Sequence, residues 1–365
     1  MDVTLVVDAL GPQLSGIGRY VWELCRRVPA QSLVEDTRFF SNGRFIEDPG
    51  SLLAPGGQHA RMRLPRWARR WTVRHRLQSS LVHGPNYFLP PEADSGVITV
   101  HDLSIFRYPD AHPAARLRSF ERQFESSLAR AAHVITDSET VRLEVIADFG
   151  LAETEVTAIP LGAGEEYQPR SAKEVEAPLQ SLGLKPGEYA LCVSTLEPRK
   201  KIAELLRAWR HLPEGLRNSA PLALAGARGW LNEQLHEEIR QASAAGWLKH
   251  LGFVPEAVLP SLYAGARLFL YPSIYEGFGL PPVEAMASGV PVLVANRLCL
   301  LEICGDAAKC VDPDDVIGFS AAIEEALTDS RWRMQTRERG LERAAAFSWE
   351  RCAAQTVDVY RSVFR

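Results

Sequence analysis

The sequence predicts an α/β protein of two doubly wound domains, each with a mainly parallel sheet covered by helices on both faces. Short apolar, β-branched runs alternate with longer amphipathic stretches, which is the pattern of repeated βαβ units. This alternation occurs twice, on either side of a polar segment at 165–188 that contains three prolines and has no sustained periodicity. The length of 365 residues also suits two domains, at roughly 100 to 200 residues per domain.

The candidate strands are short, and each is followed by a polar or glycine-containing loop. In the first half they are 4–8, 80–83, 97–100, 134–136 and 156–159. In the second half they are 189–194, 221–225, 248–251, 268–271, 290–294 and 309–311. Helices are expected between them, for example over 116–130 and 203–211. Because doubly wound sheets bind ligands at the carboxyl ends of their strands, two such domains facing one another would form a ligand cleft.

We therefore expect an N-terminal domain at 1–168, a C-terminal domain at 169–347 and a final helix within 348–365. Ser348 is a suitable helix cap, and the apolar residues Val357, Tyr360 and Val363 follow at helical spacing. Two placements of this helix are compatible with the pattern. It could cross back over the interdomain region, or it could be the ordinary last helix of the second domain.

Composition excludes several classes of protein. The chain is 46% hydrophobic, and its 41 basic and 45 acidic side chains give a formal charge of −4, so no global field favours nucleic acid. The six cysteines form no CxxC pair and have no histidines at zinc spacing, which suits reduced, buried thiols. No basic leader region and no apolar run of about 18 residues is present. We expect a soluble cytoplasmic protein that can associate with the inner face of the membrane.

The most informative stretch is 275–291, in which seven residues separate Glu276 from Glu284. It follows the strand 268–271, and its two adjacent prolines suit the opening turn of a helix, so Glu276 is expected in the loop and Glu284 in the first turn. Prolines have no amide proton, so amide donors at this helix entrance must come from 277–280. Such a terminus attracts an anion such as a diphosphate. The alternative is a Gly/Pro-rich turn in which Glu284 only complements the helix dipole.

A second signal is the cation run Arg199-Lys200-Lys201, which follows the strand 189–194 and leads into an amphipathic helix. Cations are poorly placed at a helix N-terminus unless an anion joins them. Three of them at the end of a strand can neutralise a diphosphate leaving group. Ordinary solvation of a helix start is the alternative.

The first half has weaker signals of the same kind. Gly16 and Gly18 form a glycine turn that opens a helix and could offer amides to a phosphate, although a tight βα turn would have the same sequence. His101 and Asp102 follow the strand 97–100. A lone histidine is more often structural, but one at a strand end can hold a sugar or help to deprotonate a hydroxyl.

Positive charge is concentrated in one segment of the first half. No Asp or Glu occurs between Pro49 and Pro91, and the range Arg61–Arg76 interleaves seven arginines with two tryptophans. Arginine and tryptophan on a short helix are what an anionic bilayer interface attracts. The alternative is a basic rim that binds a lipid diphosphate acceptor without touching the bilayer.

These motifs resemble glycosyltransferase family 4, the retaining enzymes of GT-B architecture. Glu276 and Glu284 match its EX7E motif. The surrounding segment, YEGFGLPPVEAMASGVPV, is similar to the corresponding segment of bacterial mannosyl- and rhamnosyltransferases that build O-antigen or exopolysaccharide. The resemblance covers nearly the whole chain, because it extends to VHGPNYFLPP, VHDLSIFRYP, VITDSE, STLEPRKKI, AGARGW and LGFVPEAVLPSLYAGA.

The resemblance implies a role for each candidate residue. The catalytic group would be His101 beside the anomeric carbon, Glu276 at the donor sugar and Lys200 at the diphosphate. Further donor contacts would come from Gly16, Gly18, Arg199, Phe253 near the nucleobase, Gly277, Phe278, Gly279, Leu280, and Glu284 at the ribose. Asp102 and Tyr87 would lie on the acceptor side.

The implied reaction is transfer of a hexose with retention, with mannose from GDP-mannose as the first choice of donor. The acceptor would be a glycan or a polyprenyl-diphosphate-linked sugar in surface polysaccharide biosynthesis, and neither a cofactor nor a metal is expected. Two other functions stay open from the sequence. One is a nucleotide-sugar epimerase on the same architecture, and the other is a non-catalytic scaffold or glycan-binding subunit.

Overall fold

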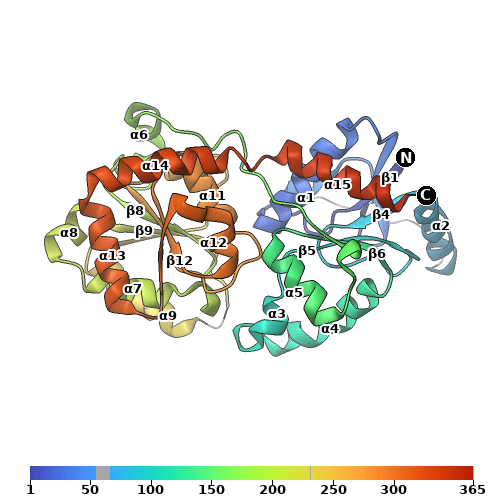
Figure 1. Cartoon of the computed structure of the whole chain (residues 1–365), viewed down its shortest axis with the longest axis horizontal. Helices are drawn as coiled ribbons and strands as arrows, with labels where there is room; N and C mark the ends of the chain where they lie inside the picture. The colour runs from blue at the N-terminus through green and yellow to red at the C-terminus, as the bar shows by residue number, and fades with distance from the viewer. Residues whose placement is uncertain (55–65, 231, 365) are drawn as a thin grey trace. The chain divides into compact units, whose positions relative to one another are not determined.

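The computed structural model describes residues 1–54, 66–230 and 232–364, with only the backbone described for 66–70 and 116. The chain forms two compact α/β units (Figure 1). The first unit contains residues 1–103, 115–162 and 348–365, and the second contains 104–114 and 163–347. The main division therefore falls at 162, and a short segment after His101 belongs to the second unit.

The first unit has a seven-stranded sheet in the order β3-β2-β1-β4-β5-β6-β7. All neighbouring strands are parallel except β2 and β3. The strands are β1 (Asp2–Val6), β2 (Asp36–Ser41), β3 (Arg44–Ile46), β4 (Leu81–Gly84), β5 (Gly96–Val100), β6 (Ala131–Thr136) and β7 (Val156–Ala158). The helices are α1 (Gly16–Arg27), α2 (Arg66–Gln78), α4 (Ala114–Leu128), α5 (Glu139–Phe149) and α15 (Trp349–Val363).

The hairpin of β2 and β3 was not among the predicted strands. Its turn is Asn42-Gly43, and both residues have positive φ, 49° and 78°. An Asn-Gly pair between two short runs is the strongest local signal for a two-residue hairpin. The flanking strands lack the apolar pattern by which the other strands were predicted. Strand β2 begins with the polar residues Asp36, Thr37 and Arg38, and β3 is only three residues long.

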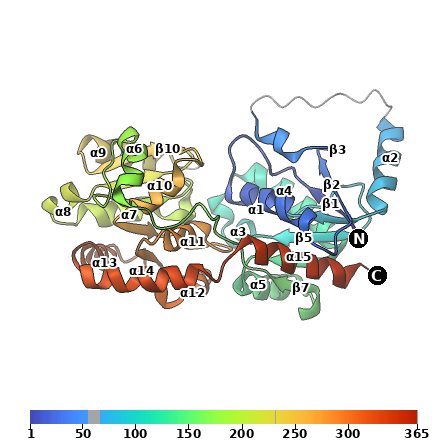
Figure 2. The same cartoon turned by 90° about the horizontal axis from the view of Figure 1, so that it is seen from above.

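The last helix, α15, belongs to the first unit, where it lies alongside α1 and packs against β6 (Figures 1 and 2). Ser348 caps it, because its hydroxyl accepts a hydrogen bond from the amide of Arg351 at 3.2 Å. Its inner face is tied to the sheet by polar contacts as well as by apolar packing. The Tyr360 hydroxyl lies 2.6 Å from Nδ1 of His83, whose Nε2 lies 2.9 Å from the Thr99 hydroxyl.

Burial of His83, followed in importance by the nearby charge of His101, lowers the pKa of His83 from 6.5 to about 3. His83 is therefore neutral in the folded chain at physiological pH, while the unfolded chain binds a proton below about pH 6.5. Stability from this group is present above that value and is lost as pH falls toward 3. We expect the free energy of unfolding to decrease by about 1.4 kcal/mol per pH unit in that window.

Urea unfolding between pH 7 and pH 4 tests this prediction. His83→Gln has no titrating group at this position, so its free energy of unfolding should fall less steeply over the same range. Equal slopes for the two proteins would show that His83 is not the group responsible.

The second unit has a six-stranded sheet in the order β10-β9-β8-β11-β12-β13, with all neighbours parallel. Its strands are β8 (Ala190–Val193), β9 (Leu222–Ala225), β10 (Leu248–Gly252), β11 (Leu268–Tyr271), β12 (Val292–Ala295) and β13 (Ala308–Val311). Its helices include α3 (Ser104–Arg107), α6 (Ala172–Ser181), α7 (Ile202–Arg210), α8 (Glu214–Ser219), α9 (Glu233–Ala244), α10 (Leu259–Ala264), α11 (Leu280–Ala287), α12 (Leu298–Cys304), α13 (Val316–Thr328) and α14 (Ser330–Ala344).

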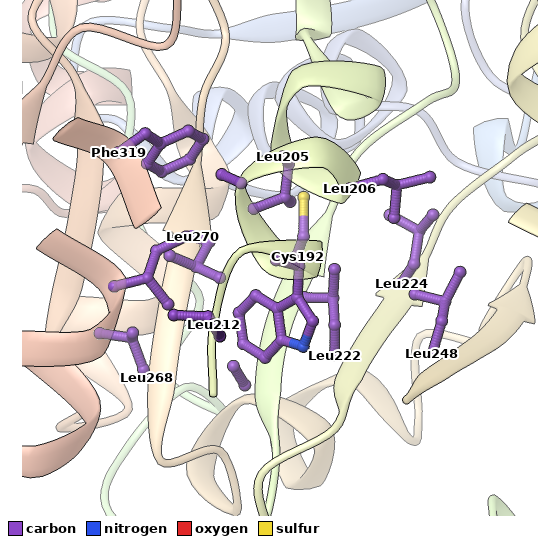
Figure 3. Packing of buried hydrophobic residues seen from close by; sticks show 14 of the residues in the cluster. Cys192, Leu205, Leu206, Leu212, Leu222, Leu224, Leu248, Leu268, Leu270 and Phe319 are labelled. Atoms are coloured by element: carbon purple, nitrogen blue, oxygen red, sulfur yellow. The ribbon is translucent and has the colours of Figure 1, made fainter. Parts of the chain in front are cut away.

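Helices cover this sheet in two layers. Helix α7 packs between α9 and α13 in one layer, while α10 packs on α6 and α11, and α11 on α14, in the other (Figure 1). The core beneath α7 brings Leu205 and Leu206 of that helix against leucines of β9 and β11 and against Phe319 of α13 (Figure 3). This packing holds α7 and its preceding loop in place, which matters because that loop carries Arg199 and Lys200.

The strands predicted from the sequence are all present, with ends shifted by a few residues, and the helices expected at 116–130 and 203–211 occur as α4 and α7. No disulfide joins any two of the six cysteines, all of which lie among the described residues. Within the described part of the chain, no helix combines the length and apolarity that a membrane crossing requires.

Candidate functional site

The second unit has its topological switch point between β8 and β11. From β8 the chain moves outward through β9 to β10, then returns to β11 beside β8 and moves outward in the opposite direction through β12 to β13. Loops at the carboxyl ends diverge at such a point and leave a crevice in which doubly wound domains bind ligands. Lys200 follows β8 and Glu276 follows β11, so the sheet order places both residues at this position.

Three charged side chains meet there. Lys200 Nζ is hydrogen-bonded to the Glu276 carboxylate and lies 3.1 Å from the Tyr271 hydroxyl. Arg199 Nη1 donates to the carbonyl oxygen of Tyr275 at 2.7 Å and lies 3.4 Å from Glu276 Oε2. Lys200 is only 6% exposed and Glu276 9%, so this is a largely desolvated ion cluster. The structure therefore brings together Arg199, Lys200 and Glu276, three of the candidate residues predicted from the sequence.

The third cation of the run lies elsewhere. Lys201 adopts a left-handed backbone conformation, with φ 53°, between a short 3-10 turn and α7. Its ammonium group lies 3.2 Å from Glu204 and 2.8 Å from Asp314. The expectation of three cations at one anion site is corrected to two, because the change of backbone direction at Lys201 turns its side chain toward other carboxylates.

Two supporting residues were not predicted from the sequence. Glu197 accepts hydrogen bonds from the Thr195 hydroxyl at 2.7 Å and from Arg199 Nε at 3.1 Å, and it is buried. The hydroxyl of Tyr271, the last residue of β11, accepts a hydrogen bond from Lys200 Nζ at 3.1 Å. Spacing in the sequence could not identify the Tyr271 contact, because it depends on β11 lying next to β8.

The formal charges of this cluster balance, with Arg199 and Lys200 opposing Glu197 and Glu276. Burial by itself would raise the pKa of Glu276, but the charges of Lys200 and then Arg199 outweigh it and lower that pKa to about 2. Burial, followed by the charge of Arg199, lowers the pKa of Lys200 from its ordinary value. Glu276 is thus an anion throughout the physiological range, and an incoming phosphate would compete with it for the two cations.

The loop after β11 leads directly into α11, which begins at Leu280. Gly279 precedes it with φ 98°, a left-handed backbone conformation that favours glycine, and an added Cβ there would lie 2.9 Å from Leu300 Cδ2, so the end of that side chain would have to shift. Glu284 is the fifth residue of α11, so its expected place in the first turn is wrong. Glu284 is buried close to Tyr263 of α10, and its charge, after burial, raises the pKa of that tyrosine.

Phe253 lies at the carboxyl edge of the same sheet, directly after β10, and its side chain is 43% exposed. Strands β9 and β8 separate β10 from β11, so Phe253 lies further along the edge than the ion cluster. An exposed aromatic ring at this edge is available for stacking on a planar group.

The first unit holds the remaining candidate residues. His101 follows β5, with Nδ1 2.8 Å from Asp137 Oδ2 and Nε2 2.9 Å from the carbonyl oxygen of Pro85. The amide of Asp102 donates to the Tyr87 hydroxyl at 3.0 Å. Tyr87 is buried and contacts phenylalanine rings of α4, so it supports the loop that carries His101 and Asp102.

The glycine turn opens α1, which begins at Gly16. The amide of Gly18 donates to the Ser15 hydroxyl at 3.1 Å, and an added Cβ would lie 3.0 Å from the carbonyl oxygen of Ala9. The expectation that Gly18 offers its amide to a phosphate is therefore corrected, because the helix cap already uses that donor. Gly16 is exposed at the helix start.

A hollow of about 490 Å³ also lies in the second unit, with Lys185, Glu188 and Lys249 among its lining residues. These residues precede β8 or lie near the start of β10, so the hollow is at the amino-terminal edge of the sheet. Neither Lys200 nor Glu276 lines it, and it has no part in the site described above.

Comparison with known proteins gives the family. Residues 178–343 match the family model described as glycosyl transferases group 1, and residues 14–166 match glycosyltransferase family 4. The chain is 38% identical over 380 residues to O-antigen chain mannosyltransferase B of Escherichia coli, across 99% of this chain and 100% of that protein.

Solved structures agree on the fold. Alr3699/HepE of Anabaena, in complex with UDP and glucose, has a TM-score of 0.74 at 18% identity, with 99% of this chain and 100% of that chain covered. WaaG, a glycosyltransferase involved in lipopolysaccharide biosynthesis, has a TM-score of 0.72 at 18% identity, with 98% and 99% covered. The two parallel-sheet units are thus those of the GT-B architecture. The chain belongs to the group 1 and family 4 glycosyltransferases, and it is a glycosyltransferase.

Proposed function

We propose that the chain transfers mannose from GDP-mannose, with retention, to a hydroxyl of a glycan or polyprenyl-diphosphate-linked acceptor in surface polysaccharide biosynthesis. The observation that carries the proposal is the meeting of Arg199, Lys200 and Glu276 at the switch point of the second unit. The choice of mannose and of polysaccharide assembly is supported by the name of the E. coli relative, an O-antigen chain mannosyltransferase.

In the proposed mechanism, Arg199 and Lys200 bind the diphosphate of the donor, helped by amides at the start of α11. Negative charge on the diphosphate grows as the glycosidic bond breaks, and prearranged cations in a desolvated site stabilise that charge strongly. The acceptor hydroxyl attacks the same face of the sugar, and the departing phosphate takes its proton. Because both side-chain cations serve the leaving group, the mechanism needs neither a metal nor a cofactor.

The other candidate residues are assigned around this centre. Glu276 would orient the donor sugar, Glu284 would bind the ribose and Phe253 would stack on the base. In the first unit, His101 would lie beside the reacting carbon, with Asp102 on the acceptor side. Tyr87 and Gly18 would act indirectly, since Tyr87 supports the His101 loop and Gly18 allows the tight entry to α1.

The proposal is tested by measuring nucleotide release with and without a lipid-linked acceptor. The donors to compare are GDP-mannose, GDP-rhamnose, UDP-glucose and dTDP-glucose. Nucleotide should be released fastest from GDP-mannose, and this release should depend on the acceptor. Because the proposed reaction retains configuration, the NMR coupling constant at the anomeric position should indicate the same anomer in the product as in the donor. An epimerase would instead yield an altered nucleotide sugar without any acceptor. Absence of turnover with every donor and acceptor would favour a non-catalytic subunit.

We also propose that the basic segment Arg61–Arg76 contacts an anionic membrane. Arg61 and Arg63 lie outside the described residues, as do the side chains of 66–70. In the described part, the Trp71 side chain is 70% exposed and stacks on His75, while Arg74 pairs with Asp94. A solvent-exposed tryptophan on a basic helix suits the interface between headgroups and acyl chains.

Neutralising Arg69, Arg70 and Arg74 to Gln should weaken co-sedimentation with anionic liposomes, because each basic residue near the surface contributes about 1 kcal/mol. Trp71→Ser should weaken it further by removing the apolar anchor. Arg361→Gln, an exposed substitution at the other end of the chain, is the matched control. Unchanged sedimentation of the triple variant would leave the basic-rim alternative.

A further inference from the structure

Residues 104–114, called the arm below, follow β5 of the first unit in the sequence but pack with the second unit. The arm consists of α3 and a 3-10 turn at Pro109–Ala111. The amide of His112 donates to the carbonyl oxygen of Pro109 at 3.0 Å, and its ring Nε2 lies 3.1 Å from the Ser104 hydroxyl. Because the second contact joins the two ends of the arm, the arm can dock as one folded element.

One anchor of the arm is Trp230, in the loop after β9. Its Nε1 donates a hydrogen bond to the carbonyl oxygen of Ala111 at 2.7 Å, and its ring centroid lies 5.9 Å from that of the next residue of the arm, a histidine. The loop that carries Trp230 is fixed to the loop after β8. Gly229 has φ 64°, and an added Cβ there would collide with the carbonyl oxygen of Leu196. The same oxygen accepts a hydrogen bond from Asn232 Nδ2 at 2.6 Å.

The second anchor is Tyr108, whose ring centroid lies 5.2 Å from that of Tyr275 in the loop after β11. Tyr275 is buried, it precedes Glu276, and its carbonyl oxygen accepts the hydrogen bond from Arg199. Strands β9 and β11 are the neighbours of β8 in the sheet. The two anchors therefore lie on either side of the loop that carries Arg199 and Lys200, and each is attached to a residue bonded to that loop.

Covalent geometry ties the arm to two candidate residues of the first unit. His101 and Asp102 stand three and two positions before Ser104, the first residue of the arm. Consecutive Cα atoms are about 3.8 Å apart, so the Cα atom of Asp102 lies within about 7.6 Å of that of Ser104. A docked arm therefore limits how far the stretch His101–Asp102 can move.

We propose that Trp230 and Tyr108 are positioning residues for sugar transfer, which dock the arm on the second unit and thereby hold the stretch His101–Asp102 in place for the reaction. The inference rests on the proposed function, because it takes the donor to bind at Arg199 and Lys200. The two anchors act through the arm and need not touch a substrate. Because a displacement of about 1 Å in a reacting group can cost about a hundredfold in rate, undocking should slow transfer.

The experiment compares Trp230→Phe and Tyr108→Ala with the wild-type full-length chain. Phenylalanine keeps an aromatic ring but cannot donate to the Ala111 carbonyl, and alanine removes the ring that packs on Tyr275. Docking is measured by hydrogen exchange of a peptide that covers the arm, which should exchange faster in both variants. The kcat of transfer should fall about tenfold or more, while the affinity for GDP, measured by calorimetry, stays at the wild-type value.

Two further variants separate positioning from a general loss of stability. Tyr108→Phe keeps the ring, so it should rescue both the docking of the arm and the rate. Trp332→Phe changes an indole that packs against the hydrophobic core of the second unit, and it should alter neither the exchange of the arm nor kcat.

Three results would overturn the proposal. The first is faster exchange of the arm with a wild-type kcat in either anchor variant. The second is unchanged exchange in both folded variants. The third is an equal loss of GDP affinity and kcat, because the arm would then serve donor binding.

Failure of the proposed function would give a different result. If the wild-type chain transfers sugar only from a nucleotide sugar other than GDP-mannose, the proposed donor is wrong. The same variants are then compared with the donor that is used and with its nucleoside diphosphate. Hydrogen exchange of the arm needs no substrate, so it tests docking in either case.

Discussion

Lys200→Met should lower the rate of sugar transfer by about a hundredfold or more, because it removes a cation prearranged for the charge that develops on the leaving diphosphate. Methionine keeps most of the volume of the lysine stem, so packing beside Tyr271 is largely retained. The substitution also leaves the buried Glu276 with one fewer partner, and breaking a buried pair costs about 3–5 kcal/mol of stability. Steady-state transfer and thermal unfolding should be measured on the same preparation.

Lys201→Met is the matched control for this experiment. Lys201 is the adjacent lysine, and its ammonium is held by Glu204 and Asp314. The Lys201→Met variant should transfer sugar at close to the wild-type rate. Its loss of stability should be small, as is typical when a partly exposed ion pair is removed. Equal rates for Lys200→Met and wild type, in protein shown to be folded, would remove Lys200 from the site.

Glu276→Gln should also reduce turnover by about a hundredfold, while binding of GDP stays equal or becomes tighter. Glutamine preserves the shape of the side chain but no longer supplies the charge proposed to orient the donor sugar. At the same time, the anion that competes with diphosphate for Arg199 and Lys200 is removed, so a loss of turnover with retained affinity is the expected signature.

Separate measurements of GDP affinity by calorimetry and of transfer rate distinguish these effects. Because the pKa of Glu276 is held at about 2, its ionisation should not produce a limb in the pH profile between pH 5 and 8. Near-normal turnover of Glu276→Gln would contradict the assigned role, and a parallel loss of affinity and turnover would indicate a general collapse of the site.

Local sequence pattern predicted much of the fold. The alternation of apolar and amphipathic segments identified the parallel strands of both units, since buried parallel strands form continuous apolar runs. The hairpin of β2 and β3 escaped because its polar, short strands carry little apolar pattern, although the turn Asn42-Gly43 signals it. The backbone reversal at Lys201 also has no sequence signature, because positive φ is rare for lysine.

The residues of the candidate site could be chosen from the sequence, but their contacts with one another could not. Arg199, Lys200 and Glu276 could be chosen because charged residues and glycines at strand ends indicate a ligand site. Their contacts with one another and with Tyr271 depend on β8 and β11 being neighbours, which is a property of strand order. The contact between His101 and Asp137 similarly depends on the adjacency of β5 and β6.

A crystal structure of the chain with GDP bound tests the central claim most directly. Oxygens of the diphosphate should lie within about 3 Å of Lys200 Nζ and of the Arg199 guanidinium, with the Lys200 ammonium shared between phosphate and Glu276. A diphosphate bound elsewhere, with Arg199 and Lys200 still paired only to carboxylates, would contradict it.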